Sequence, residues 1–599
     1  MTRNHPTLRR AASNADLYAD PSPPRPLRHA ASTLSRTHYR PLPDLRSRHS
    51  VGAAYANLID VDESYPAPAP AQIPPPVPPK IRPDTPAQET TTAPAPAPAP
   101  APAAAAWPPT LHPWIPRPQR AKPTPESYIK PFTDFMTANP TVFHAVDAVA
   151  KDLEKGGYKK LSERDNWELK AGGKYYVDRN GSSLIAFAVG DNYSAGSGAA
   201  IVAGHIDALT AKLKPISKLR TKAGYVQLGV APYAGALSDT WWDRDLGLGG
   251  RVLVKEGSKV VSKLVKLDWA VARIPTLAPH FGAAANGPFN KETQMVPIVG
   301  LDNSGLGGSS TEDDASWNLT SVIGGEGTFA STQPERLVKA IAGELGITDY
   351  SSIVNWELEL FDVQPATTGG LDREFIFAGR IDDKLCSWAA IQALLNSVPS
   401  LSTSSQLRIV ALFDDEEVGS LLRQGAHGNF LPSVMERIVE DFAEGSKVKS
   451  LLNRTYANSF LVSSDVIHAV NPNFLNAYLE NHSPRLNTGP AISADSNAHM
   501  TTDAVSTTIL QRCVDRDIGS RKIDPQLQVF QIRNDSRSGG TVGPMLSAAT
   551  GIRAVDCGIP QLSMHSIRAT TGSLDPGLGV FTFQSFLENF EGVDEEFRT

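Results

Sequence analysis

Cysteine is scarce in this chain, and long apolar runs are missing from it. Its 599 residues include only three cysteines, Cys386, Cys513 and Cys557. They are too few and too scattered for a disulfide framework, so we expect synthesis in a reducing compartment. No stretch of 18 consecutive apolar residues occurs, and the first residues lack the hydrophobic segment of a secretory signal. The sequence therefore predicts synthesis in the cytoplasm and no membrane as a partner.

Strong net charge and nucleotide-binding motifs are also missing. The formal net charge of −6 is small for this length, which gives no reason to expect nucleic acid or an anionic membrane as the main partner. The glycine-rich runs 247–250 and 305–308 lack the Lys-Ser/Thr of a P-loop and the spacing of a dinucleotide fingerprint. No Gly-x-Ser-x-Gly elbow occurs, which argues against a serine hydrolase of the α/β type.

Residues 1–120 differ in composition from the rest. Residues 1–50 are rich in arginine and repeat a short motif, at residues 8–13 and again at 27–32. The motif indicates either a sorting segment read by a receptor or kinase, or a basic tail without a specific role. Residues 65–109 are mostly proline and alanine, which favours extended polyproline II and cannot bury a core. We expect a disordered N-terminal arm.

The remaining chain predicts an α/β fold in three segments. In the first, residues 121–215, apolar side chains at helical spacing predict a packing helix over 141–153. Residues 216–370 carry short β-type runs between loops rich in glycine, serine and asparagine, which indicates an inserted β-rich domain. In residues 371–599, predicted strands alternate with predicted helices, as in βα units.

Four consecutive acids follow one predicted strand. The apolar run 407–413 is typical of a buried strand, and Asp414, Asp415, Glu416 and Glu417 come directly after it. Ligands of open α/β sheets bind beyond the carboxyl ends of the strands. One acid could therefore bind a metal while the next serves as a general base. A solvated acidic turn is the alternative for this motif alone.

Other short apolar runs also lead to possible metal ligands. The runs are residues 199–204, 375–378, 459–464 and 552–557, and they precede His205 with Asp207, Asp382, Asp465 and His565 respectively. Each of these residues alone could be a helix cap or an ion-pair partner. Together they provide imidazole and carboxylate ligands without thiolate, a set suited to two Zn²⁺, Mn²⁺ or Co²⁺ ions.

At these residues the chain resembles the M18 family of metallo-aminopeptidases, which includes aspartyl aminopeptidases and vacuolar aminopeptidase I. The resemblance runs from about residue 132 to the C-terminus. The matching stretches are AGHIDAL (203–209), WWDRDLGLGGR (241–251), FIFAGRIDDK (375–384), FDDEEVGS (413–420), SSDVIHAVNPNF (463–474), RNDSRSGGTVGP (533–544) and QLSMHSIRATTGS (561–573).

The resemblance implies a mixed-sheet metallopeptidase domain flanked by helices, with an inserted domain that serves oligomerisation up to a tetrahedral dodecamer. It also implies a role for each candidate residue. Asp382 would bridge two divalent ions, most simply Zn²⁺. His205 and Asp465 would complete one site, and Glu417 and His565 the other.

The same resemblance assigns the catalytic and substrate-binding residues. Glu416 would be the general base, and Asp207 would orient His205. His280 would reach a neighbouring subunit's active site and help to bind the transition state; without the resemblance it would be an ordinary loop histidine. His468 would contact the substrate, with packing or helix capping as the alternative.

One position bears on the substrate. Acid-selective aspartyl aminopeptidases place a lysine after a Gly-Pro-x-Ile segment, whereas here Ser493 follows Gly489-Pro490-Ala491-Ile492. A buried substrate carboxylate would then lack its counter-charge. The sequence therefore predicts an aminopeptidase that prefers neutral or apolar first residues such as leucine. An acid-selective enzyme, and a self-assembling autophagic cargo protein with incidental catalysis, are the alternatives.

Within the family, Trp241-Trp242, residues 537–540 and residues 569–572 favour a resemblance to the vacuolar aminopeptidase I branch, which also bears on location. Members of that branch carry a shorter N-terminal propeptide that directs delivery to the vacuole by selective autophagy. We expect cytoplasmic synthesis followed by vacuolar delivery, with residence in the cytoplasm as the alternative. A sorting receptor that binds the N-terminal arm is the partner this implies, besides peptide substrates.

Overall fold

The computed structural model describes residues 123–302, 322–521 and 523–598. The predictions made for residues 1–120 lie outside this range. Within these three ranges, the helices lack the combination of length and apolar character that crossing a bilayer requires.

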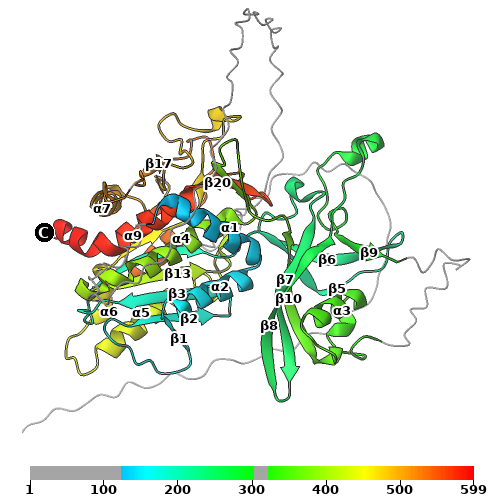
Figure 1. The fold of residues 1–599 in the computed structure, drawn as a ribbon, viewed down its shortest axis with the longest axis horizontal. Helices are drawn as coiled ribbons and strands as arrows, with labels where there is room; N and C mark the ends of the chain where they lie inside the picture. The colour runs from blue at the N-terminus through cyan, green and yellow to red at the C-terminus, as the bar shows by residue number, and fades with distance from the viewer. Residues whose placement is uncertain (1–122, 303–321, 522, 599) are drawn as a thin grey trace, which may run out of the picture. The chain divides into compact units, whose positions relative to one another are not determined.

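A mixed sheet of nine strands forms the largest layer, in the order β1-β2-β3-β13-β4-β14-β18-β16-β17 (Figure 1). At its centre β13 pairs in parallel with β4, and β4 with β14, while β3 is antiparallel to β13. The strands are β1 (Lys159–Leu161), β2 (Lys174–Arg179), β3 (Ser183–Val189), β4 (Ala199–His205), β13 (Leu407–Phe413), β14 (Phe460–Ser463), β16 (Ala491–Ser493), β17 (Gln528–Phe530) and β18 (Arg553–Gly558).

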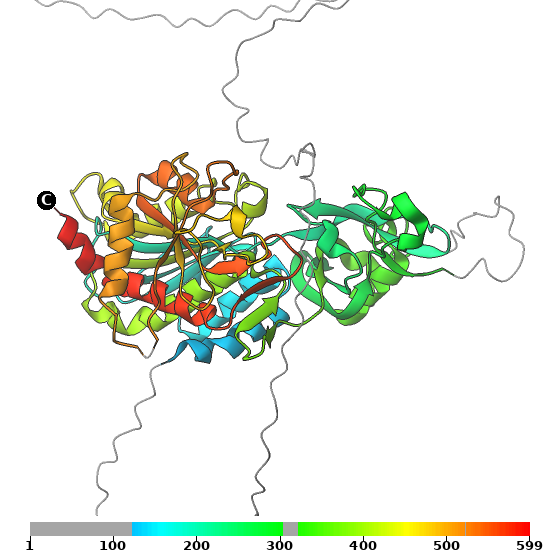
Figure 2. The same ribbon diagram turned by 90° about the horizontal axis from the view of Figure 1, so that it is seen from above.

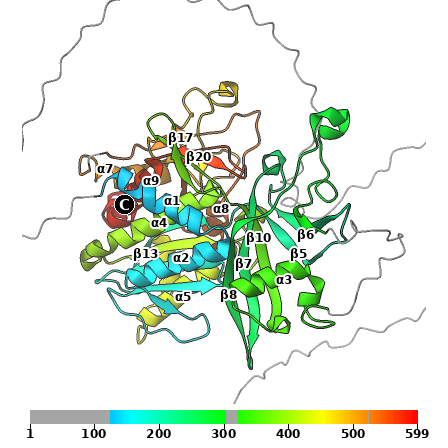
Figure 3. The ribbon, with the colours of Figure 1, turned by 45° about the vertical axis from the view of Figure 1, so that its right-hand side comes forward.

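Helices cover both faces of this sheet because the central strands are apolar on both sides. In β4, Ala200 and Val202 pack into one core cluster, while Ile201 and Ala203 pack into another. The first cluster contains side chains of α1, α2, α4, α7 and α9, and the second those of α5 and α8. Figures 1 and 3 show where these helices lie in the fold. These helices and α6 are α1 (Ile129–Ala138), α2 (Val142–Lys155), α4 (Ile381–Ser397), α5 (Phe430–Phe442), α6 (Leu451–Ala457), α7 (Ala504–Asp515), α8 (Val542–Thr550) and α9 (Asp575–Asp594). The α/β prediction is confirmed.

The predicted helix at 141–153 is α2. Thr141 is its N-cap, and its hydroxyl accepts a hydrogen bond from the backbone N–H of His144. The apolar positions that predicted the helix are all buried: Val142, Phe143, Val146, Val149 and Leu153. Capping and one apolar face together explain why this segment forms a helix against the sheet.

A second, fully antiparallel sheet has the order β8-β7-β10-β5-β6-β9. Its strands are β5 (Thr210–Lys218), β6 (Tyr225–Tyr233), β7 (Leu246–Glu256), β8 (Lys259–Ala272), β9 (Ile298–Leu301) and β10 (Ile353–Asp362). They form a green group in Figure 2 and share a core cluster with α3 (Glu335–Glu344), seen against this sheet in Figure 3. Strand β5 begins only five residues after His205 ends β4, so the second sheet starts beside that residue.

A third sheet is built from very short strands in the order β11-β12-β20-β19-β15. They are β11 (Thr367–Gly369), β12 (Phe375–Ala378), β15 (Ile467–His468), β19 (Pro560–Leu562) and β20 (Ala569–Gly572). The segment between β19 and β20 carries His565, and β12 leads into α4. This sheet therefore positions His565, contains His468 in β15, and leads into the helix that carries Asp382.

Candidate metal centre

Three parallel strands bring their acidic and imidazole residues to the same edge of the large sheet. His205 is the last residue of β4 and lies opposite Phe413, the last residue of β13. Asp414 follows β13 directly, and Asp465 comes two residues after β14. Since β4, β13 and β14 run in the same direction, their carboxyl ends meet, as the sequence predicted.

Helix α4 brings two further carboxylates to the same edge. Asp382 and Asp383 lie in its first turn, where both depart from helical dihedral angles. Lys384, only 1% exposed, anchors this turn by donating to the backbone carbonyls of Asn139 and Pro140, at 3.0 Å each. The start of α4 is thus held against the turn between α1 and α2.

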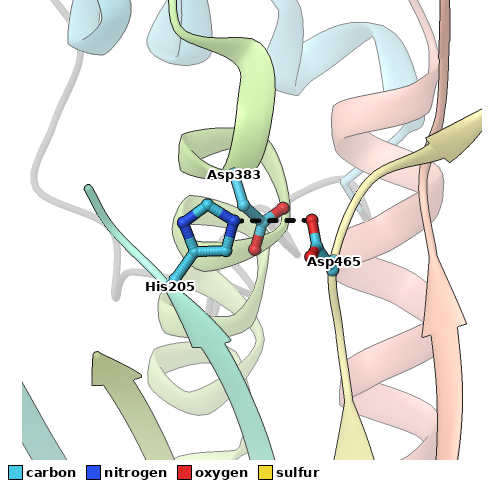
Figure 4. Close-up of side chains that lie close together, drawn as sticks. All are labelled: His205, Asp383 and Asp465. Atoms are coloured by element: carbon cyan, nitrogen blue, oxygen red, sulfur yellow. Dashed lines mark ion pairs between the residues drawn. The ribbon is translucent and has the colours of Figure 1, made fainter. Parts of the chain in front are cut away.

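Two groups of potential ligands result. The first contains His205, Asp383 and Asp465, and the second contains Asp382, Glu417 and His565. Within each group, one ligand atom per residue lies within 4.8 Å of the others. Figure 4 shows the first group, with the Asp465 carboxylate facing the His205 ring at 3.5 Å from Nε2.

Asp382 contacts both histidines. Its Oδ1 lies 3.2 Å from His205 Nε2, and its Oδ2 lies 3.6 Å from His565 Nε2. His565 Nε2 is also 3.7 Å from Glu417 Oε2. One carboxylate therefore lies between the two groups, with one oxygen directed to each.

Glu416 and Asp207 lie beside these groups. Glu416 Oε2 is 3.7 Å from His205 Nε2, although Glu416 belongs to neither group. Asp207 Oδ1 is 3.2 Å from the other ring nitrogen of His205, Nδ1. The backbone N–H groups of Glu416 and Glu417 donate to the two oxygens of Asp207, each at 3.3 Å. Asp207 thus contacts both the histidine and the acidic turn.

The backbone is unusual next to three of these residues. Arg380, Asp415 and His565 have φ angles of 60°, 62° and 61°, in the left-handed region that non-glycine residues rarely adopt. Arg380 directly precedes α4, and Asp415 directly precedes Glu416. His565 is itself a candidate ligand. Such conformations collect at functional sites because the surrounding structure must enforce them.

The donor chemistry fits divalent cations. Glu417 Oε1 is buried without a hydrogen-bond partner in the described residues, and so are both oxygens of Asp383, which have only the Cys386 thiol nearby as a weak donor. Buried carboxylate oxygens are costly unless a cation or donor compensates them. Imidazole nitrogens and carboxylate oxygens are ligands that Zn²⁺ accepts.

The electrostatics point to the same conclusion. Burial raises the pKa of Glu416 to about 8, with Asp465, Asp207 and Asp382 adding to the shift against the opposing effect of His205. Burial and then Asp382 raise the pKa of Glu417 well above its usual value. Burial would lower the pKa of His205, but Asp465 and Glu416 outweigh it and raise that pKa well above 6.5. Such perturbed groups in one cluster mark a functional site.

These shifts predict how stability depends on pH. Glu416 has an ordinary pKa of 4.5 and about 8 in the fold, so the cation-free folded protein binds more protons than the unfolded chain between these values. We expect the chelated protein to lose stability as pH rises from 5 to 8, and bound cations to remove that loss. Thermal unfolding of chelated and zinc-loaded protein across this range measures it. The difference in unfolding temperature between zinc-loaded and chelated protein reports on the site alone. We expect this difference to grow as pH rises from 5 to 8, and a difference that shrinks would contradict the prediction.

Two other predicted residues lie elsewhere. His280 is exposed in a 3₁₀ segment (Pro279–Ala285) and is in neither ligand group. His468 ends β15 and packs beside Phe530, with ring centroids 5.8 Å apart and the ring planes tilted by 52°. Burial and then the charge of His565 lower the pKa of His468, which places it within electrostatic range of the second group.

Sequence reasoning missed two residues of the site. Asp383 lies in the matching stretch 375–384, and its position directly after Asp382 is the signal that could have identified it. Tyr233 ends β6 in the second sheet, and its hydroxyl donates to Asp207 Oδ2 at 2.6 Å. Nothing in the local sequence around Tyr233 signals this contact.

A cavity adjoins the second group. Its empty volume is about 400 Å³, including space open to solvent, and Asp382 and His565 are among its lining residues. Most of the lining is apolar, with Leu209, Trp241, Phe361, Ile381 and Ile567. Of its charged members, Asp362 is paired with Arg244, and Arg380 donates to the carbonyl of Met136.

The known proteins that this chain resembles are aminopeptidases. The family model "Aminopeptidase I zinc metalloprotease (M18)" matches residues 135–587. Vacuolar aminopeptidase 1 of Saccharomyces cerevisiae is 43% identical over 480 residues, which cover 79% of this chain and 90% of that protein. Aspartyl aminopeptidase of Aspergillus oryzae is 39% identical over 482 residues, covering 78% of this chain and 96% of that one.

Solved structures agree with this assignment. The structure of Chaetomium thermophilum mApe1 is 56% identical, with a TM-score of 0.71, over 79% of this chain and 99% of that one. The structure of the S. cerevisiae mApe1 dodecamer is 39% identical, with a TM-score of 0.67, over 79% of this chain and 99% of that one. Because the family model matches residues 135–587 and the relatives are similar over more than three quarters of the chain, the chain belongs to the M18 family of zinc metalloproteases and is a metallo-aminopeptidase.

Proposed function

We propose that this chain removes neutral or apolar first residues from peptides, using two divalent cations, most simply Zn²⁺. The observation that carries the proposal is the placement of Asp382, which has one oxygen directed to His205 and the other to His565. His205 and Asp465 would hold one cation, Glu417 and His565 the other, and Asp382 both. Bound there, the cations would polarise the scissile carbonyl and make a water molecule more acidic.

The protein's own residues supply the proton transfers. Glu416 is the general base that takes the proton of the attacking water and returns it to the leaving amine. Its pKa of about 8 in the cation-free fold falls when cations bind beside it, which makes the carboxylate available near neutral pH. Asp207 accepts from His205 and from the backbone of the acidic turn, and so keeps the histidine and the base in one arrangement.

Support for the neutral preference comes from the cavity beside Asp382 and His565. Its largely apolar lining suits a leucine side chain, whose transfer from water is favourable. Of its charged members, Asp362 is paired with Arg244, whereas Arg380 donates to the carbonyl of Met136 and has a buried Nε without a hydrogen-bond partner in the described residues. Ser493, where acid-selective relatives carry lysine, ends β16 at 4% exposure and offers no positive charge.

A panel of aminoacyl anilides tests the proposal. We expect kcat/KM for the leucine substrate to exceed that for the aspartate and glutamate substrates by about 10²-fold or more, because an unpaired carboxylate costs several kcal/mol on burial. Cation content is measured on the same preparation. Faster cleavage of the acidic substrates would make the chain an acid-selective enzyme, and absence of cleavage would favour the cargo-protein alternative.

Substituting Ser493 provides the matched control for this panel. Ser493→Lys places the cation of the acid-selective branch in an otherwise unchanged protein. If the position faces the first residue of the substrate, this variant gains activity on the aspartate substrate relative to the leucine substrate. An unchanged ratio would mean that selectivity resides elsewhere in the cavity.

Assembly and location follow from the relatives. We propose a homo-oligomer of the dodecameric kind, built through an inserted domain at residues 216–370 between catalytic segments 121–215 and 371–599. Exposed apolar side chains on that segment support this, among them Ile216, Val260, Trp269 and Phe281. In such an assembly His280 would act in a neighbouring subunit. The vacuolar relative supports delivery to the vacuole, and the solved complex of Ape4 with Nbr1 supports a protein partner such as a sorting receptor.

A further inference from the structure

The second sheet contributes a side chain to the metal centre. Tyr233 is the last residue of β6 and is 9% exposed. Its hydroxyl oxygen lies 2.6 Å from Asp207 Oδ2 and 3.4 Å from Asp415 Oδ1. Since a hydroxyl carries one proton, the shorter contact takes the hydrogen bond. Tyr233 therefore donates to Asp207.

That hydrogen bond is the shortest one that Asp207 accepts. The contacts from His205 Nδ1 and from the backbone of Glu416 and Glu417 measure 3.2, 3.3 and 3.3 Å. Short hydrogen bonds to an ionised carboxylate are stronger than long ones. Of the four partners, the hydroxyl of Tyr233 thus constrains the Asp207 carboxylate most.

Tyr233 is itself held in place. The ammonium of Lys212, on the neighbouring strand β5, lies 3.8 Å from the centroid of the Tyr233 ring, where a cation–π interaction is favourable. Burial, and then the nearby charge of Asp207, raise the pKa of Tyr233 far above 10, so its hydroxyl stays protonated. The ring would keep its position if only the hydroxyl were removed.

We propose that Tyr233 is a positioning residue of the peptidase reaction, which acts by fixing the Asp207 carboxylate. Fixed in this way, Oδ1 of Asp207 orients the His205 ring, and both oxygens hold the turn that carries Glu416 and Glu417. The proposal rests on the proposed function for the roles of His205 and Glu416. It makes the second sheet part of the catalytic apparatus in each single subunit, separately from any role in assembly.

Tyr233→Phe tests this in the full-length assembled protein. We expect kcat to fall about 10–100-fold with KM nearly unchanged, because Tyr233 acts on the site and not on the substrate. We expect zinc to be lost to a chelator about 10–100-fold faster, since ligand orientation weakens. Normal kcat together with normal zinc retention would overturn the proposal.

Tyr158→Phe is the matched control. Tyr158 is 3% exposed, and its hydroxyl has no hydrogen-bond partner within the described ranges. The variant therefore deletes a buried hydroxyl group that is not part of the site. We expect kcat and zinc retention to match the parent protein. If both tyrosine variants lose activity equally, the effect is one of packing and the proposal fails.

A double-variant comparison tests the route through Asp207 even if Tyr233→Phe lowers stability. We expect Tyr233→Phe to reduce zinc retention in the parent protein but to add almost nothing in an Asp207→Asn background. Additive losses would mean that Tyr233 does not act through Asp207. Zinc retention needs no substrate, so this result stands even if the anilide panel shows that the proposed function is wrong.

Discussion

We expect replacement of Glu416 with glutamine to remove nearly all turnover and to leave cation content and assembly unchanged. Glutamine has nearly the same shape as glutamate but cannot take a proton from water. Glu416 lies 3.7 Å from His205 and in neither ligand group, so every ligand of the two proposed cations remains after the change. A positioned general base contributes about 10²–10⁴-fold, and we expect kcat to fall by the upper part of that range.

The measurements are kcat for the leucine anilide, zinc per chain, and the mass of the assembly. Glu440→Gln is the matched control, because Glu440 is an exposed residue of α5, and we expect parent-like values in all three. If Glu416→Gln lowers the zinc content or disperses the oligomer, Glu416 has a structural role and the base must be sought elsewhere. Retained turnover would contradict the mechanism outright.

Much of the centre could be predicted from the sequence because local patterns decide it. The buried run 407–413 is β13. The ends of β4 and β14 also lie within one residue of the ends of the runs predicted for them. The apolar character of both strand faces predicts a central position in a sheet covered by helices on both sides. Parallel strands then bring His205, the acids after β13 and Asp465 to one edge without further information.

The other parts of the site depend on contacts between segments that are far apart in sequence, which local patterns do not predict. The sequence suggested that residues 552–557 lead to His565, whereas the structure interposes β19 of a separate sheet. Strands of two to four residues leave almost no periodic signal. Tyr233 reaches Asp207 across 26 residues from an antiparallel sheet, and no local pattern encodes that pairing. The resemblance to a family, and not periodicity, supplied the assignment of His565.

The second large effect is expected from replacing Asp382 with asparagine, which should release both of the proposed cations. The two oxygens of Asp382 lie 3.2 Å from His205 and 3.6 Å from His565. Asparagine keeps the shape but removes the negative charge and turns one of the two oxygens into a donor group. One of the proposed sites then loses its oxygen ligand, the other keeps only a neutral amide oxygen, and both lose the shared negative charge. Because a bound cation supplies several kcal/mol of transition-state stabilisation, we expect kcat/KM to fall about 10³-fold or more.

Asp465→Asn makes this test specific for a shared ligand. It removes the same charge from the same edge of the sheet, but Asp465 belongs only to the group of His205 and Asp383. We expect zinc per chain, measured after dialysis against a weak chelator, to fall from two towards none in Asp382→Asn and from two to one in Asp465→Asn. Equal losses in the two variants would mean that Asp382 serves one cation only. In that case Asp383, buried beside His205 without a strong donor, would be the second carboxylate of the first site, and the reaction would need a different arrangement of charge around the water that Glu416 activates.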